Sequence, residues 1–243
     1  MSGFTCQGYV LHRLPYRETS LLVDVLTLES GKLRVVAKGV RGSKSDRKSL
    51  LQPFQLLECV VSGRNELRNL GRVEALSGRV SLTQQALYCG FYLNELLSRA
   101  LPIDLPHEEI FSDYQLALQH LAKAGSDTRS ADVEIILRSF ELKLLEHLGY
   151  LPDLSACAES HNPIEEGASY TFLPEQGFVT ATLSGDHQAH SAPLFYGRDI
   201  IAMQMQDWHT TSLRAAKLFV RLALPSVIGS KPLQSRSLFA QVK

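Results

Sequence analysis

Basic residues gather in one short stretch of the chain, and their types and spacing suit phosphate binding. From Lys38 to Lys48 the sequence reads KGVRGSKSDRK, in which glycines and serines allow a phosphate backbone to approach the cations closely. The stretch lacks the G-x-x-x-x-G-K-[ST] spacing of a nucleotide P-loop, so it predicts nucleic-acid binding rather than nucleotide hydrolysis. The candidate phosphate contacts are Arg34, Lys38, Arg41, Lys44, Arg47 and Lys48. The alternative is a solvated loop tip whose charges serve only solubility.

One aromatic side chain belongs to the same group of candidates. Tyr16 lies beside Arg17 in the segment LPYRETS, between two predicted strands, where an exposed ring can stack on an unpaired base. Tyr9 and Phe54 also belong to the predicted barrel, where stacking is an option; Tyr9 lies within a strand, so core packing is an alternative for it, and only Tyr16 lies in a loop beside an arginine. We therefore add Tyr16 and Arg17 to the candidate DNA-binding residues.

A metal site and a catalytic site find less support. Cys157, His161, His187 and His190 have a loosely zinc-like spacing, but without a CxxC pair a loop with exposed histidines and one partly buried thiol is the simpler interpretation. The chain has no G-x-S-x-G and no H-E-x-x-H motif, and acids such as Glu141 are expected to be solvated on a helix. We expect no cofactor, no bound metal and no enzymatic activity; a zinc-dependent hydrolase is the alternative from another class.

Composition and charge divide the chain into two parts. Its 243 residues are 44% apolar and 21% charged, as in ordinary globular proteins, and the net charge is zero. Residues 1–80 nevertheless hold 13 Lys and Arg against 7 Asp and Glu, a net charge of +6, which leaves −6 for the remainder. A basic first part suits a polyanion. Four cysteines without a CxxC pair, and no apolar run of about 20 residues, predict a soluble cytoplasmic protein that does not bind membranes.

Residues 4–80 have the pattern of short strands separated by turn residues. The predicted strands are Cys6–Leu14, Ser20–Thr27, Lys32–Val40, Phe54–Ser62 and Glu66–Arg79. In the third, Leu33 and Val35 alternate with Lys32 and Arg34, which predicts a basic outer face. Five short strands favour an OB-fold barrel, with an SH3-like barrel or a small sandwich as alternatives.

From residue 82 the apolar period becomes helical. The predicted helices are Leu82–Leu101, His107–Ala124, Ser130–Leu148, Arg198–Trp208 and Ser212–Leu224, the last stopped by Pro225. Between them, residues 150–197 are rich in Pro and Gly, with a possible hairpin at Tyr170–Phe172 and Phe178–Leu183. We predict an α+β protein, with an OB-fold domain at residues 1–80 and a helical domain at 81–243 that carries an irregular insertion.

Several of these stretches together resemble the RecO recombination mediators, a family of bacterial DNA-repair proteins. The matching segments are VL at 10–11, RETSL at 17–21, SGK at 30–32, VAKGVR at 36–41, LQPF at 51–54, YLNELL at 92–97, FELKLLEHLGY at 140–150, LRAAK at 213–217 and GSKPLQSRSLF at 229–239. They follow one another in the family's order over nearly the whole chain, and the last is the most distinctive.

The resemblance implies a function and a set of partners. Members bind single- and double-stranded DNA, anneal complementary strands, work with RecR and the single-strand-binding protein, and so lead to RecA loading; such a protein would join the nucleoid when active. Many members carry zinc on two CxxC pairs. Here Ser160 stands where the partner cysteine of Cys157 would be, and residues 177–180 hold no second pair. The resemblance therefore implies a metal-free hairpin at the insertion. An RNA-binding OB adaptor is a further alternative.

The acidic tail of the single-strand-binding protein calls for an apolar pocket beside a cation. On the helix Ser130–Leu148, an apolar stripe runs past Arg138, whose planar fork suits a carboxylate. The predicted tail-binding residues are Arg138, Leu137, Phe140 and Leu144. The alternative is that Arg138 pairs with Glu134 or Glu141 on its own helix.

Overall fold

The computed structural model describes residues 3–41, 47–126, 130–181 and 193–240. By its contacts the chain separates into two compact units, residues 1–133 with 232–243 (unit 1) and residues 134–231 (unit 2). The domain boundary expected at residue 80 marks a change in composition and charge. Unit 1 extends past that boundary and also holds two helices that come after the barrel. Among the described residues, no helix is both long enough and apolar enough to span a membrane.

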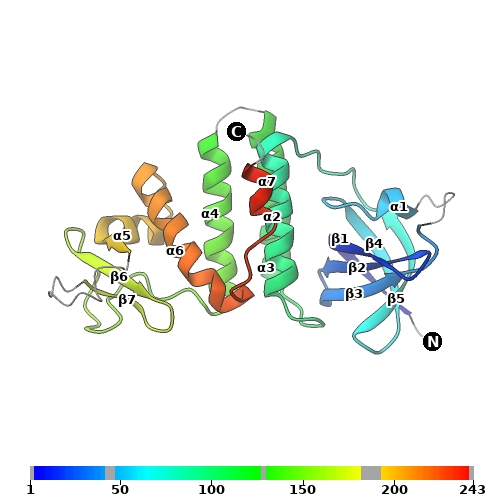
Figure 1. The fold of residues 1–243 in the computed structure, drawn as a ribbon, viewed down its shortest axis with the longest axis horizontal. Coiled ribbons are helices and arrows are strands. Elements are labelled where there is room, and N and C mark those ends of the chain that lie inside the picture. The colour runs from blue at the N-terminus through cyan, green and yellow to red at the C-terminus, as the bar shows by residue number, and fades with distance from the viewer. Residues whose placement is uncertain (1–2, 42–46, 127–129, 182–192, 241–243) are drawn as a thin grey trace. The chain divides into compact units, whose positions relative to one another are not determined.

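Unit 1 begins with a closed five-stranded barrel (Figure 1). Its strands are β1 (Gly3–Tyr16), β2 (Ser20–Thr27), β3 (Gly31–Ala37), β4 (Leu56–Ser62) and β5 (Leu67–Ala75). β1 pairs antiparallel with β2 and β4, and β3 closes the barrel by pairing parallel with β5. The short helix α1 (Arg47–Leu50) lies between β3 and β4 in the chain. This topology confirms the predicted OB-type barrel and the α+β class.

The barrel interior is apolar because alternate residues of each strand point inward. Val10, Val23, Val35 and Leu57 are fully or almost fully buried in one cluster. The predicted strands matched in number and order, although β3 ends at Ala37 and β5 at Ala75, earlier than expected.

Two helices of unit 1, α2 (Gln84–Ala100) and α3 (Glu108–Ser126), are fastened to the barrel by a buried polar chain. The Asn94 side-chain amide donates to the carbonyls of Val10, at 3.4 Å, and Leu11, at 3.1 Å. The Tyr114 hydroxyl in turn donates to the Asn94 carbonyl oxygen at 2.6 Å. β1 changes register between Val10 and His12, and this bulge leaves both carbonyls able to accept from one amide.

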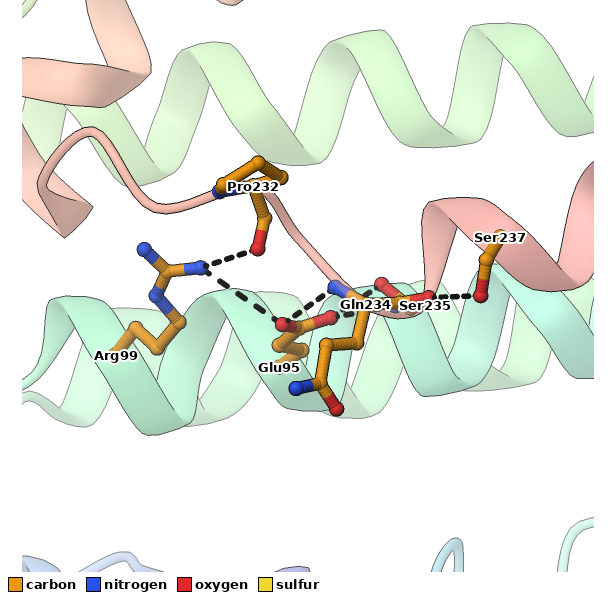
Figure 2. Close-up of polar contacts among 6 residues, drawn as sticks. All are labelled: Glu95, Arg99, Pro232, Gln234, Ser235 and Ser237. Carbon is orange, nitrogen blue, oxygen red and sulfur yellow. Dashed lines mark hydrogen bonds and ion pairs between the residues drawn. The ribbon is translucent and has the colours of Figure 1, made fainter.

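The C-terminal residues return to unit 1 and lie along α2, as Figure 2 shows. The Glu95 carboxylate accepts hydrogen bonds from the backbone N–H groups of Gln234, at 2.9 Å, and Ser235, at 2.8 Å, and from the Ser235 hydroxyl at 2.6 Å. Arg99 donates to the Pro232 carbonyl at 3.3 Å. We call residues 232–235 the C-terminal strap; it leads into α7 (Arg236–Ala240), a helix that the sequence pattern did not predict.

Unit 2 contains most of α4 and a small sheet with two helices. Its elements are α4 (Ser130–His147), β6 (Ser169–Leu173), β7 (Gly177–Thr180), β8 (Leu194–Tyr196), α5 (Gly197–Met205) and α6 (Thr210–Ile228). The expected hairpin is present as β6 and β7, and β8, which was not predicted, pairs with the other side of β6.

Two expectations for unit 2 are wrong. Pro225 does not stop α6, which continues to Ile228 before Gly229 ends it. Pro225 removes the N–H that would bond the carbonyl four residues earlier, but the helix continues past it and the Gly229 N–H still donates to the Pro225 carbonyl at 2.9 Å. Glu141 is not solvated but fully buried, because it pairs with Arg138 one turn earlier on α4. Gly149 ends the run as expected, with φ of 75° and the Tyr150 N–H donating to the Leu145 carbonyl at 2.7 Å.

Candidate nucleic-acid interface

The turn between β1 and β2 meets the start of the basic stretch. The Arg41 backbone N–H donates to the Thr19 carbonyl at 3.0 Å, and its guanidinium donates to the Arg17 carbonyl, also at 3.0 Å. Arg17 adopts a left-handed backbone, with φ of 51°, which turns the chain back toward β2. These bonds bring together residues that lie about twenty positions apart in the sequence.

Four predicted contacts converge at this end of the barrel, and we call them the basic rim. They are Tyr16, Arg17, Lys38 and Arg41. Lys38 joins them by register, because Tyr16 pairs with Ser20, Leu21 pairs with Ala37, and Lys38 directly follows Ala37. The three cations are exposed and Tyr16 is half-buried. The Arg17 guanidinium lies 5.3 Å from the centre of the Tyr16 ring, which orders both side chains at the surface. Clustered exposed cations beside an aromatic ring suit a phosphate backbone with a neighbouring base.

Arg34 differs from the rim because its charge is already paired. Its guanidinium donates to both carboxylate oxygens of Asp24, at 2.7 and 2.9 Å. The hydrogen bond with Asp24 raises the pKa of Arg34 above its ordinary value. The Arg34 side chain is 41% exposed, so a phosphate could reach it only in competition with Asp24. The expected basic outer face of β3 is wrong, because Lys32 is buried.

Arg47 serves the barrel itself. Its guanidinium donates to the carbonyls of Leu70, at 3.2 Å, and Gly71, on β5. From the other side, Arg13 donates to the Leu51 carbonyl at 3.1 Å and to Gln52 at 2.9 Å. α1 is thus held between β1 and β5.

The remaining residues of the basic stretch divide between exposed and undescribed positions. Lys48 is exposed, and Lys44 lies outside the described residues. The structure therefore separates the predicted cluster into an exposed rim, where Arg41 also bonds the Arg17 carbonyl, and two arginines, Arg34 and Arg47, whose guanidinium groups bond within the barrel. Sequence reasoning missed Arg13 and Asp24, whose partners come from distant segments that no local spacing reveals.

The predicted tail-binding residues of α4 are buried. Arg138 pairs with Glu141, with 2.9 Å between Nη1 and Oε2, and the two side chains are 8% and 0% exposed. This is the alternative that the sequence left open. Leu137, Phe140 and Leu144 are each at least nine-tenths buried, so they present no exposed apolar stripe.

Exposed cations instead lie on α6, which carries no acidic residue. Arg214, Lys217 and Arg221 are exposed and fall on one helical face by their three- and four-residue spacing. Lys217 reaches Glu134 of α4, at 3.4 Å, so this face adjoins α4.

Cys157 lies in a small polar cluster rather than in a ligand set. Its sulfur is 3.6 Å from the Thr180 hydroxyl, and the residue is 2% exposed. Hydrogen bonds from the Ser160 side chain and backbone, and a weaker one from Thr180, lower the pKa of the Cys157 thiol to about 6. His161 is exposed, whereas His187 and His190 lie outside the described residues. Within the described ranges, no group of three or more Cys, His, Asp or Glu residues is placed to hold a metal ion.

A closed OB barrel with an exposed basic rim, followed by helices, is typical of nucleic-acid-binding proteins. Two family models cover this chain: Recombination protein O N terminal matches residues 1–79, and Recombination protein O C terminal matches residues 83–237. The chain therefore belongs to the RecO family of DNA repair proteins, which confirms the resemblance seen in the sequence.

Individual relatives agree with the family models along nearly the whole chain. The DNA repair protein RecO of Pseudoalteromonas atlantica is 46% identical over 241 residues, which cover 99% of this chain and 96% of the relative. The proteins of the same name from Actinobacillus succinogenes and Haemophilus influenzae are each 44% identical, covering 96% and 97% of this chain and 94% and 95% of theirs.

Proposed function

We propose that this chain binds single- and double-stranded DNA, anneals complementary strands, and helps to load RecA onto DNA coated with single-strand-binding protein. The observation that supports this proposal is the convergence of Arg17, Lys38 and Arg41 at one exposed end of the barrel. Cations at such a rim lower the repulsion between two phosphate chains, and annealing requires no covalent chemistry. The bases then stay exposed to pair with each other.

The test is annealing of complementary oligonucleotides, bare and coated with single-strand-binding protein, together with DNA binding against salt. The double variant Arg17→Gln, Lys38→Gln removes two rim cations. Each lost phosphate contact reduces the slope of log affinity against log salt by about 0.7 on single strands and about 0.9 on duplexes. We expect slopes lower by about 1.4 and 1.8, and slower annealing.

The matched control is Arg64→Gln, which removes an exposed arginine from the β4–β5 turn of the same barrel. We expect it to leave both slopes unchanged. If the double variant keeps the wild-type slope and annealing rate, the rim is not the DNA site. Competition between DNA and RNA of matched sequence separates this function from an RNA-binding adaptor, which would prefer the RNA.

We further propose that the acidic tail of the single-strand-binding protein docks where α4 and α6 adjoin. Arg138 remains the predicted cation on α4, and the exposed Arg214 and Arg221 of α6 offer charge that a tail can reach without opening a core. Titration of a labelled tail peptide distinguishes them. The double variant Arg214→Ala, Arg221→Ala should weaken tail binding at least tenfold if the tail docks on α6. Weakening by Arg138→Ala instead would mean that the Arg138 guanidinium leaves Glu141 to bind the tail. The proposal of RecR as a further partner rests on family membership.

A further inference from the structure

The outer face of β2 and β3, which OB-fold proteins commonly use for oligonucleotides, is largely covered in this chain. Side chains on this face alternate with those of the barrel core. Asp24 and Leu26 of β2 are 5% and 0% exposed, and Lys32 and Val36 of β3 are 6% and 7% exposed. On this face only Leu22 and Arg34 are partly exposed, and Arg34 is paired with Asp24, so the two strands offer little surface on which bases can stack.

The end of α2 covers the polar part of this face. The buried Lys32 ammonium donates to the Ser98 carbonyl at 2.7 Å, where the last turn of α2 leaves carbonyls without helical partners. The Ser98 hydroxyl donates to Asp24 at 3.3 Å, and Asp24 also accepts the two bonds from Arg34. The two buried charged groups of this face, Lys32 and Asp24, thus find their hydrogen-bond partners within unit 1.

The connection between α2 and α3 covers the start of β3. The Asp104 N–H donates to the Lys32 carbonyl at 3.0 Å, and Asp104 pairs with Arg68 of β5 at 2.9 Å. Gly31 has φ of 67°, and a Cβ there would lie 1.8 Å from the Leu105 carbonyl oxygen. The connection therefore lies directly against the strand, at a position where only glycine fits.

We propose that DNA meets this barrel end-on, at the basic rim, through its phosphate backbone, and does not run across β2 and β3. This inference rests on the proposed function and gives it a binding mode. Three described cations at the rim predict a salt slope of about −2 for single strands and about −3 for duplexes of the same length. Because no base lies on the covered face, strands held at the rim stay free to pair, and single strands and duplexes use the same contacts.

Photo-crosslinking from two exposed positions of the full chain tests the mode. A benzophenone side chain is placed either at Thr19, in the β1–β2 turn, or at Leu105, which is 50% exposed in the α2–α3 connection that covers β3. Both positions tolerate a new side chain because neither is buried. The probes are a labelled single-stranded oligonucleotide and a duplex of equal length, and retention of DNA is measured on the same samples.

We expect both probes to crosslink from Thr19 and neither from Leu105. Retained DNA with crosslinks from Leu105, or from Leu105 and Thr19 equally, would overturn the end-on mode while the proposed function stands. DNA retained without crosslinks from either position would also overturn it. Failure of both variants and of the unmodified chain to retain DNA would overturn the proposed function together with the mode.

Discussion

The Glu95 carboxylate is the main polar anchor of the C-terminal strap, so Glu95→Gln should release the strap (Figure 2). The glutamine oxygen can keep the two bonds from Ser235, but its amide N–H₂ then faces the Gln234 N–H. One charged hydrogen bond is lost and two become neutral. Bonds to charged groups contribute about 1.5–3 kcal/mol and neutral ones about 0.5–1.5 kcal/mol. One lost charged bond and two that each weaken by about 1–1.5 kcal/mol should therefore weaken strap docking by about 3.5–6 kcal/mol.

Hydrogen exchange at the strap amides measures this directly, since their exchange requires the strap to open. At about 1.4 kcal/mol per tenfold, the expected loss corresponds to exchange at Gln234 and Ser235 that is roughly 300-fold to about 20,000-fold faster. Glu109→Gln, at an exposed glutamate of α3 in the same unit, is the matched control and should leave strap exchange unchanged. Unchanged exchange in Glu95→Gln would refute the carboxylate's role.

The pH dependence of the strap follows from the same contacts. Partial burial raises the pKa of Glu95, but the hydrogen bonds from Ser235 and Gln234, with the charge of Arg99, outweigh it, so the pKa lies below its ordinary value of 4.5. Because the pKa is lowered in the folded state, the ionised carboxylate stabilises docking fully above pH 4.5. That stabilisation is lost as the pH falls through the lowered pKa. Strap exchange, corrected for its intrinsic pH dependence, should therefore rise in acid in the wild type and much less in Glu95→Gln.

Three further predictions concern unit 2. Arg138→Ala deprives the buried Glu141 of its ion-pair partner and should lower the free energy of unfolding by about 3 kcal/mol or more in denaturant titration, whereas a loss under 1 kcal/mol would mean the pair is not buried in solution. The Cys157 thiol, with a pKa of about 6 against an ordinary 9.0, should be ionised at pH 7. The contribution of the thiolate to folding stability should be complete above pH 9 and lost as the pH falls through 6. The ultraviolet absorbance of the thiolate, titrated with Cys157→Ser as the blank, measures the pKa, and a midpoint near 9 would contradict the prediction. Pro225→Ala should raise the free energy of unfolding by about 1–3 kcal/mol because it restores a helical N–H donor within α6, and a loss on thermal or chemical unfolding would show that the proline fits its site better than alanine.

Local patterns were sufficient to predict most of the secondary structure. Two-residue alternation and turn residues located all five barrel strands, and three- and four-residue steps located the five longer helices. β8 and α7 escaped because each is too short to show a period of its own. β8 exists because β6 offers it an unpaired edge, and the strap is ordered by Glu95, 139 residues before Gln234. Such long-range causes leave no local signal.

The candidate nucleic-acid interface was predictable as a region but not residue by residue. The basic stretch and the LPYRETS turn were recognised separately, and the Arg41 bonds to Thr19 and Arg17 bring them together. What the pattern could not show is which cations the fold itself uses. Arg34 pairs with Asp24 on the neighbouring strand. The two residues lie ten positions apart in the sequence, and only the strand register shows that they lie opposite each other.

The small sheet of unit 2 shows how the insertion can hold together through its own side chains. Phe178 contacts Phe172, Phe195 and Phe219, with ring centres 5.3, 5.2 and 5.5 Å away, and Phe172 also meets Phe219 at 4.9 Å. Aromatic pairs contribute about 0.5–1.5 kcal/mol each beyond the area they bury, so four contacts amount to several kcal/mol. Three of these rings come from β6, β7 and β8 and one from α6, so the cluster joins the sheet to the helix. The aromatic cluster thus stabilises the insertion through its own side chains, while the Cys157 sulfur makes hydrogen bonds with the hydroxyl groups of Ser160 and Thr180.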